Sequence, residues 1–201
     1  MSDPSTIETV TVAAIGDLHV TETCHNRYRE MFEEISEAAD VLALAGDLTN
    51  FGKVAEAEIL AEDLRACTIP VVAVLGNHDY EAGEPGEVVR ILQSAGVTML
   101  GEQATVIDGV GFAGAKGFIG GFGRGELGAF GEDAIKVFVD EARNEARLLE
   151  KAKQIRSLLA YSLRGHARLS DRENIIVGVS AQAFANPIVK FGQRENLDVF
   201  R

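Results

Sequence analysis

The sequence predicts an α/β protein built around a parallel β-sheet. Short apolar segments that end at a glycine alternate with segments that have the 3.6-residue apolar period of an amphipathic helix. This alternation is typical of βαβ units, whose parallel strands are covered on both faces. The 201-residue chain is 46 % hydrophobic and 25 % charged, as globular proteins are, so we expect a single domain over residues 1–201.

The predicted elements of the first half follow one another regularly. The run VTVAAI before Gly16 predicts the first strand, and the run VLALA before Gly46 predicts the second. Between them, Met31, Phe32 and Ile35 recur at helical spacing. The full set comprises strands at residues 10–15, 41–45 and 70–75, helices at residues 26–39, 54–65 and 87–95, and further strands at residues 97–100 and 104–107.

The second half is less regular. A short apolar run predicts another strand, and the glycine-rich stretch after it predicts a long surface loop. A segment rich in Ala, Glu, Lys, Arg and Leu then predicts a long helix. The expected elements are a strand at residues 110–113, a loop at 114–131, a helix at 132 to about 160, a strand at 175–179, a turn with a short helix at 185–191 and a last apolar run at 197–200.

The charge of the chain limits its function. It carries 19 Lys and Arg against 31 Asp and Glu, and a net charge of −12 argues against non-specific nucleic-acid binding because it repels phosphate backbones.

No apolar run reaches the roughly 18 residues that a membrane span needs. The N-terminus is polar, unlike a signal peptide, and the two cysteines form no Cys-x-x-Cys pattern. We therefore expect a cytoplasmic protein with no membrane partner.

Polar side chains follow the first three predicted strands. The strands end in G-D-L-H, G-D-L-T-N and G-N-H-D, which contain Asp17 and His19, Asp47, and Asn77 and His78. Asp17, Asp47 and Asn77 are each 30 residues apart, about one βα unit, so all three are expected at the carboxyl edge of the sheet. A single Gly-Asp after a strand is ordinarily a turn or a helix cap. Three such motifs at even spacing favour a shared site.

The residue types at this edge favour a metal centre. Carboxylate and amide oxygens with imidazole nitrogens are ligands for Mn, Fe, Zn or Ni. Asp17 and Asp47 placed together without a cation would repel each other, and one carboxyl pKa would rise. Two divalent metal ions would remove this conflict if one aspartate bridged them. They would also suit an in-line displacement at phosphorus.

These motifs resemble the signature of the calcineurin-like metallophosphoesterase family, which runs D-x-H, G-D, G-N-H-D/E, a later His and then G-H-x-H. The resemblance implies a four-layer αββα sandwich with two metal ions at the strand ends. It implies that Asp17 and His19 bind the first metal, that Asp47 bridges and that Asn77 binds the second metal. His78 would contact the scissile phosphate and protonate the leaving oxygen.

The family pattern uses five histidines and this chain has four. His25 matches none of the motifs and is expected to be a solvated or capping residue. His166 is then the only histidine left for three expected ligands. The second divalent ion, deprived of nitrogen ligands, is expected to bind weakly.

Two placements of the tail are open. In the first, residues 158–162 (LLAYS) correspond to the family's L-L-H-Y-[AS]-P strand with Ala160 in place of the histidine, and the sandwich is incomplete at the C-terminus. Its uncovered sheet edge would then favour a homo-oligomer. In the second placement, residues 165–168 (GHAR) are an altered G-H-x-H, with Arg168 replacing the second histidine. The first placement is favoured because the segment FANPIV fits the stretch that precedes the final motif.

The glycine-rich loop also has two interpretations. Lys116 and Arg124 could offer positive charge to a phosphate near the metals. Alternatively, the loop is only a surface connection, and this interpretation is favoured because the loop lacks the strand–turn–helix context of a nucleotide-binding motif.

The motifs together predict a metal-dependent phosphoesterase that hydrolyses a phosphomonoester or phosphodiester through a dinuclear metal centre. The alternative is a truncated or catalytically impaired metallophosphoesterase homologue that acts as a metal-binding or scaffold protein. The intact first three motifs favour the enzyme, and the incomplete histidine set favours the impaired homologue.

Overall fold

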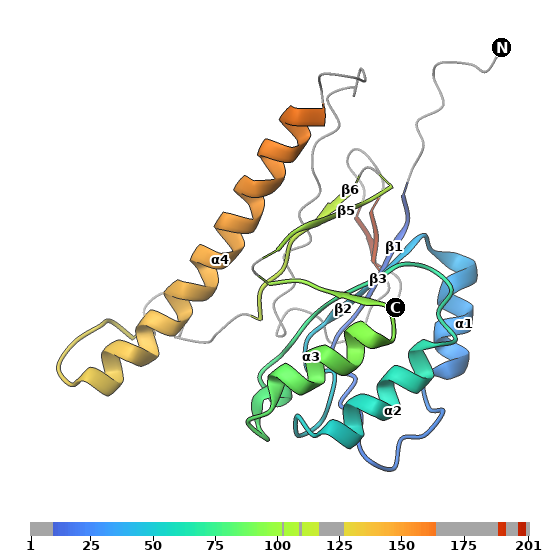
Figure 1. The fold of residues 1–201 in the computed structure, drawn as a ribbon, viewed down its shortest axis with the longest axis horizontal. Coiled ribbons are helices and arrows are strands. Elements are labelled where there is room, and N and C mark those ends of the chain that lie inside the picture. The colour runs from blue at the N-terminus through green and yellow to red at the C-terminus, as the bar shows by residue number, and fades with distance from the viewer. Residues whose placement is uncertain are drawn as a thin grey trace.

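A four-stranded parallel sheet forms the centre of the protein (Figure 1). The computed structural model describes residues 10–101, 103–108, 110–116, 127–163, 189–191 and 197–199. The strands pair in chain order, β1 (Val12–Ile15), β2 (Val41–Ala45), β3 (Val71–Val74) and β4 (Val97–Met99). Their register aligns Val12 with Val41 and Leu42 with Val71, so successive strands end at one edge.

Three helices cover one face of this sheet. They are α1 (Arg29–Ala38), α2 (Val54–Leu64) and α3 (Pro85–Ser94). Because each connection is a right-handed crossover that moves one strand further in the same direction, all three helices come to lie on the same face. The central strands are buried on both faces, as their uninterrupted apolar sequences predict. In β2, Leu42 and Leu44 pack against the helices, and Ala43 and Ala45 face the other way.

The opposite face is covered by an antiparallel hairpin of β5 (Thr105–Ile107) and β6 (Val110–Phe112). Phe112 is fully buried against Val72 and Val74 of β3. The long helix α4 (Asp133–Leu163) lies beyond this hairpin, on the side away from α1 (Figure 1). The layers thus run helix, sheet, hairpin and helix. This order confirms the predicted α/β class and its αββα arrangement.

The C-terminal part differs from expectation in two places. Residues 158–162, expected to form a strand in the favoured placement of the tail, lie inside α4, which continues to Leu163. Leucine and alanine are strong helix formers, and no glycine or proline interrupts them before residue 165. The short helix expected within residues 185–191 was also wrong at its end, because residues 189–191 form strand β7.

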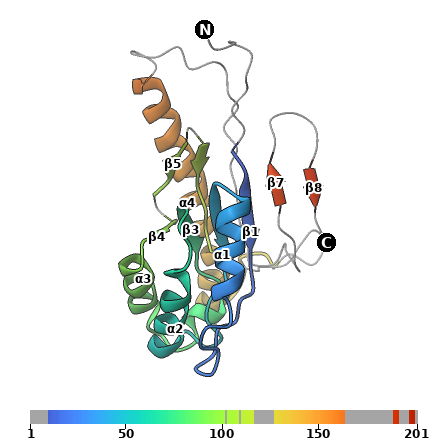
Figure 2. The ribbon, with the colours of Figure 1, turned by 90° about the vertical axis from the view of Figure 1, so that its right-hand side faces the viewer.

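Strand β7 (Val189–Phe191) pairs with β8 (Leu197–Val199), and β7 lies beside β1 (Figure 2). The strand expected at residues 175–179 and the residues His166, Arg168 and Arg124 lie outside the described part of the chain. Within the described residues, no helix combines the length and apolar character that crossing a membrane would need.

Local residues explain where α3 and α1 begin. Pro85 occupies the first turn of α3, where its missing N–H costs no hydrogen bond. The first helix begins at Arg29 and not at residue 26, because the preceding residues form a turn in which the Arg27 N–H donates to the Cys24 carbonyl. The connection from β1 to α1 is therefore a long loop that begins at the predicted site.

Candidate metal centre

The ends of β1 and β2 bring their polar residues together. The two chain segments stay hydrogen-bonded beyond the strands: the Asp17 N–H donates to the Gly46 carbonyl at 3.1 Å, and the His19 N–H donates to the Asp47 carbonyl at 2.9 Å. These bonds fix the D-x-H turn against the G-D turn. The side chains of Asp17, His19 and Asp47 therefore start from one rigid backbone unit.

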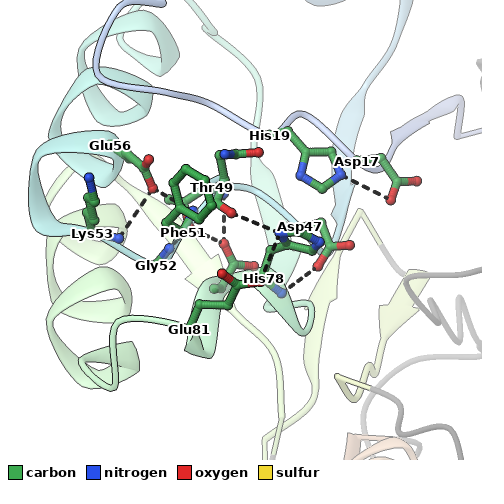
Figure 3. Close-up of polar contacts among 12 residues, drawn as sticks. Asp17, His19, Asp47, Thr49, Phe51, Gly52, Lys53, Glu56, His78 and Glu81 are labelled. Carbon is green, nitrogen blue, oxygen red and sulfur yellow. Dashed lines mark hydrogen bonds and ion pairs between the residues drawn. The ribbon is translucent and has the colours of Figure 1, made fainter.

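The third strand adds His78 to this unit (Figure 3). One ligand atom from each of His19, Asp47 and His78 lies within 4.8 Å of the others. The two imidazole rings meet edge to face with their centroids 4.6 Å apart. The His78 N–H donates to Asp47 Oδ1 at 3.0 Å, and Asp17 Oδ1 lies 3.9 Å from His19 Nε2. The strand ends thus gather two carboxylates and two imidazoles.

Asn77 and His25 occupy different places. Asn77 is exposed at the end of β3, at the same sheet edge and directly before His78. His25 is exposed in the loop between β1 and α1 and is not a member of the metal-ligand group. Asn77 therefore stays available to the predicted second metal, whereas the structure gives His25 no part in the site.

The electrostatics of the site favour a cation. Burial and the neighbouring Asp47 carboxylate raise the pKa of Asp17, although His19 and His78 oppose the rise. The Asp47 side chain itself is buried. Divalent cations held between these carboxylates would cancel their repulsion.

The backbone is strained at the same residues. Asp17, His19 and Asp47 all have positive φ, at 55°, 46° and 49°, a conformation that non-glycine residues rarely adopt. Such residues cost about 1–3 kcal/mol each and cluster at functional sites. Three of the predicted ligand residues thus have this uncommon backbone conformation.

The residues present fit a metal ion. His19 Nδ1 is buried and has no hydrogen-bond partner within the described part of the chain, which is costly for an imidazole unless some group occupies its lone pair or accepts its proton. Together with the convergent donors and the strained backbone, this unsatisfied nitrogen favours a cation site built from Asp17, His19 and Asp47.

Gly76 makes room for Asp47. A Cβ at Gly76 would overlap both Oδ1 and the backbone nitrogen of Asp47. Any side chain there would displace the aspartate at the centre of the site. The glycine of G-N-H-D is therefore required by close approach.

Comparison with known proteins decides the family. The family model of the calcineurin-like phosphoesterases matches residues 10–167. The chain belongs to the calcineurin-like phosphoesterase family. This confirms the resemblance inferred from the three motifs, and the match covers all the strands of the parallel sheet.

Individual members of the family match a smaller part of this chain. The symmetrical bis(5'-nucleosyl)-tetraphosphatase of Burkholderia mallei (strain SAVP1) is 42 % identical over 81 residues, which are 40 % of this chain and 27 % of that protein. The enzyme of the same name from Burkholderia pseudomallei (strain 668) is 46 % identical over 84 residues, with the same shares. The chain matches only about a quarter of the length of these curated relatives.

A solved structure is also similar. It is described as a novel archaeal phosphodiesterase, is 11 % identical to this chain, and covers 94 % of this chain and 99 % of its own with a TM-score of 0.42.

Asp79 has a role that the motifs alone did not indicate. Its fully buried carboxylate accepts hydrogen bonds from the N–H groups of Leu48, Thr49 and Gly76 and from the Thr49 hydroxyl, at 2.6–3.2 Å. Burial raises the pKa of Asp79, and these hydrogen bonds oppose the rise. The carboxylate thus ties the turn after β2 to the turn after β3. In the sequence, only the position of Asp79 at the end of the G-N-H-D motif could have indicated this role.

Replacing Asp79 with asparagine is expected to lower the free energy of unfolding by about 2–4 kcal/mol, because both carboxylate oxygens accept and an NH₂ group would face a backbone donor. Urea denaturation measures the change. Asp63→Asn is the matched control, because Asp63 is equally buried but accepts the Tyr28 N–H, at 3.0 Å, through a single oxygen. An equal loss in the two variants would contradict the role given to Asp79.

Lys116 contacts two acidic side chains of α4 and an aromatic ring. Its ammonium lies 3.5 Å from Glu141 and 3.7 Å from Glu145 on α4, and 5.2 Å from the centre of the Tyr80 ring. These contacts join α4 to the segment that follows His78. They favour the structural interpretation of this part of the glycine-rich loop.

Proposed function

We propose that this chain is a metal-dependent phosphoesterase that hydrolyses a phosphomonoester or phosphodiester through a dinuclear metal centre. The observation that carries the proposal is the convergence of His19, Asp47 and His78 ligand atoms within 4.8 Å. Asp17 and His19 would hold the first ion and Asp47 would bridge to the second, which Asn77 would hold. Family membership supports the phosphoesterase class.

The metal ions would supply a water of lowered pKa and neutralise charge on the phosphoryl oxygens. They would also offset the net charge of −12, which otherwise repels a phosphate ester. The protein's own contribution is to orient the ester and to supply a proton. Both tasks fall to the residues at the strand ends.

His78 is the proposed proton donor. The Asn50 carbonyl lies 2.8 Å from His78 Nδ1, and because a carbonyl only accepts, Nδ1 carries a hydrogen. The nitrogen of His78 that can gain or lose a proton is then Nε2. The hydrogen bond to Asn50 raises the pKa of His78, supported by Asp47 and Glu81 and opposed by burial. In its protonated form the ring could donate the Nε2 proton to a leaving oxygen.

The second candidate is a catalytically impaired homologue that binds metal or acts as a scaffold. The small number of imidazoles at the site favours this candidate. Of the histidines in the described residues, only His19 and His78 lie at the site, and His25 is exposed elsewhere. A second ion held by Asp47 and Asn77 alone would bind weakly. The cytoplasmic location and the homo-oligomer expected from the sequence remain predictions.

Metal removal and restoration test the proposal. Chelated protein is expected to hydrolyse 4-nitrophenyl phosphate or bis(4-nitrophenyl) phosphate only at the buffer rate, and added Mn²⁺ is expected to restore a weak turnover. Zn²⁺, Ni²⁺ and Fe²⁺ serve as comparisons. A dinucleoside tetraphosphate belongs in the assay because the relatives are named for it.

Calorimetric titration with Mn²⁺ separates the two candidates. Metal binding with turnover supports the enzyme, and metal binding without turnover of any substrate supports the impaired homologue. The absence of metal binding would contradict both.

A further inference from the structure

We propose that Glu56 is a positioning residue for His78, acting through the backbone of residues 49–53, which we call the Asn50 loop. This inference rests on the proposed function, because it concerns the proton that His78 would deliver. Glu56 lies in the first turn of α2, and its carboxylate faces the backbone of the Asn50 loop. Its role follows from what this carboxylate holds.

Glu56 binds the Asn50 loop from inside the protein. The residue is 1 % exposed, and one oxygen, Oε2, accepts the N–H of Phe51 at 2.8 Å and the N–H of Lys53 at 3.3 Å. The second bond is the glutamate half of a capping box. A buried carboxylate is costly unless it accepts such hydrogen bonds, so the loop and Glu56 stabilise each other.

The Asn50 loop in turn holds the His78 ring. The Asn50 carbonyl, one residue before the Phe51 N–H that Glu56 binds, accepts from His78 Nδ1 at 2.8 Å. Glu56 and His78 thus bind the two ends of a single peptide unit, the one that joins Asn50 to Phe51. Movement of the Phe51 amide would carry the carbonyl with it, because the peptide group is planar.

The Asn50 loop has little room to shift while keeping the hydrogen bond between the Asn50 carbonyl and His78 Nδ1. Gly52 has a φ of +70°, and a Cβ there would lie 2.7 Å from the Asp79 carbonyl oxygen and 3.2 Å from that of His78. The Gly52 N–H also donates to the Thr49 hydroxyl at 3.1 Å. The backbone of the loop therefore packs directly on the backbone that carries His78.

Two other side chains hold the loop at its ends: Asp79 accepts from the N–H and the hydroxyl of Thr49, and Glu22 pairs with Lys53. Lys53 pairs with Glu22 at 2.7 Å, but both side chains are about half exposed, and such pairs contribute about 0–1 kcal/mol. Glu56 is the buried side chain that binds the residue directly after Asn50, because it accepts the Phe51 N–H, whereas Asp79 binds Thr49 before it. The loss of Glu56 is expected to release the Asn50 carbonyl, to free His78 Nδ1, and to let the ring adopt either tautomer or turn away from the leaving oxygen.

The first test needs no activity. In the metal-free full chain, ¹⁵N NMR of the neutral imidazole is expected to show His78 with its hydrogen on Nδ1. Glu56→Leu, which keeps the volume and removes both hydrogen bonds, is expected to shift His78 toward a mixture of tautomers. Glu56→Gln is expected to keep the wild-type spectrum, because one amide oxygen can accept both N–H groups. Glu58→Ala, an exposed glutamate on the same helix, is the control.

The second test uses leaving groups. Proton donation matters most for a poor leaving group. Glu56→Leu is therefore expected to lower kcat for phenyl phosphate by about tenfold or more and kcat for 4-nitrophenyl phosphate clearly less, with KM unchanged. Glu56→Gln is expected to restore both. Should Glu56→Leu fail to fold, Glu56→Ala repeats the two tests.

If His78 keeps the wild-type tautomer in Glu56→Leu, the inference is overturned. It is also overturned if Glu56→Leu lowers kcat equally for phenyl phosphate and for 4-nitrophenyl phosphate. Failure of wild-type protein to hydrolyse either substrate would instead count against the proposed function, and the NMR result would still decide whether Glu56 positions His78.

Discussion

Asp47→Ala is expected to abolish metal binding and to reduce Mn²⁺-dependent hydrolysis by at least about two orders of magnitude. Even residues that only orient a metal ligand typically contribute about 10–100-fold, and Asp47 is placed to be a direct ligand. Its carboxylate lies close to both imidazoles, is buried, and accepts the His78 N–H at 3.0 Å. Removal takes away the charge and the acceptor together. Calorimetry with Mn²⁺ and initial rates measure the two losses.

Asp47→Asn separates these two effects. The amide oxygen can still accept the His78 N–H, so the fold of the site should survive, but the charge that attracts a cation is gone. We expect it to bind Mn²⁺ poorly and to keep the wild-type melting temperature in chelator. Asp140→Ala, on the exposed face of α4, removes a carboxylate that pairs with Arg143 and should change neither property. Wild-type Mn²⁺ affinity in Asp47→Ala would refute the metal centre.

Gly76→Ala is expected to have the second largest effect. The new Cβ would overlap the backbone nitrogen of Asp47 as well as its carboxylate, and a backbone atom cannot move aside as a flexible side chain can. Overpacking of this kind typically costs about 1–3 kcal/mol, and occasionally more. Because the atoms displaced belong to Asp47, metal affinity should fall along with stability.

Gly86→Ala is the matched control for this variant. Gly86 lies in α3, where a Cβ at this position would have no neighbour within 4 Å, so alanine should be neutral or stabilise the helix by about 0.5–1 kcal/mol. Thermal denaturation in chelator and Mn²⁺ titration compare the two. If Gly76→Ala melts and binds metal as wild type does, the close approach between β3 and Asp47 is not the reason for a glycine at residue 76.

The sequence was a sufficient guide wherever the signal was a run of apolar residues. The run at residues 41–45 became β2 with the predicted bounds, and the even spacing of Asp17 and Asp47 placed both at one sheet edge. Parallel pairing carries this information, since the ends of successive strands must emerge together. The C-terminal half was harder. Residues 158–162 are apolar in a pattern that suits either a strand or a helix.

The supporting contacts of the site were beyond the sequence for a different reason. The acceptor for His78 is a backbone carbonyl, that of Asn50, and every residue has one, so no residue type marks it. Glu56 reads as an ordinary glutamate in the first turn of a helix. Only the folded chain shows that its side chain is buried and turned back on the Asn50 loop.

The order of the strands has a geometric consequence for the proposed pair of ions. Neighbouring strands lie about 4.8 Å apart, and the two metals of such hydrolases sit about 3.5–4 Å apart. β1, β2 and β3 lie side by side in chain order. The predicted ligands that follow neighbouring strands are therefore separated by a distance close to that between two such metal ions. Asp47 follows β2, the strand between β1 and β3, so the strand spacing places its carboxylate where a ligand shared by the two proposed ions would lie.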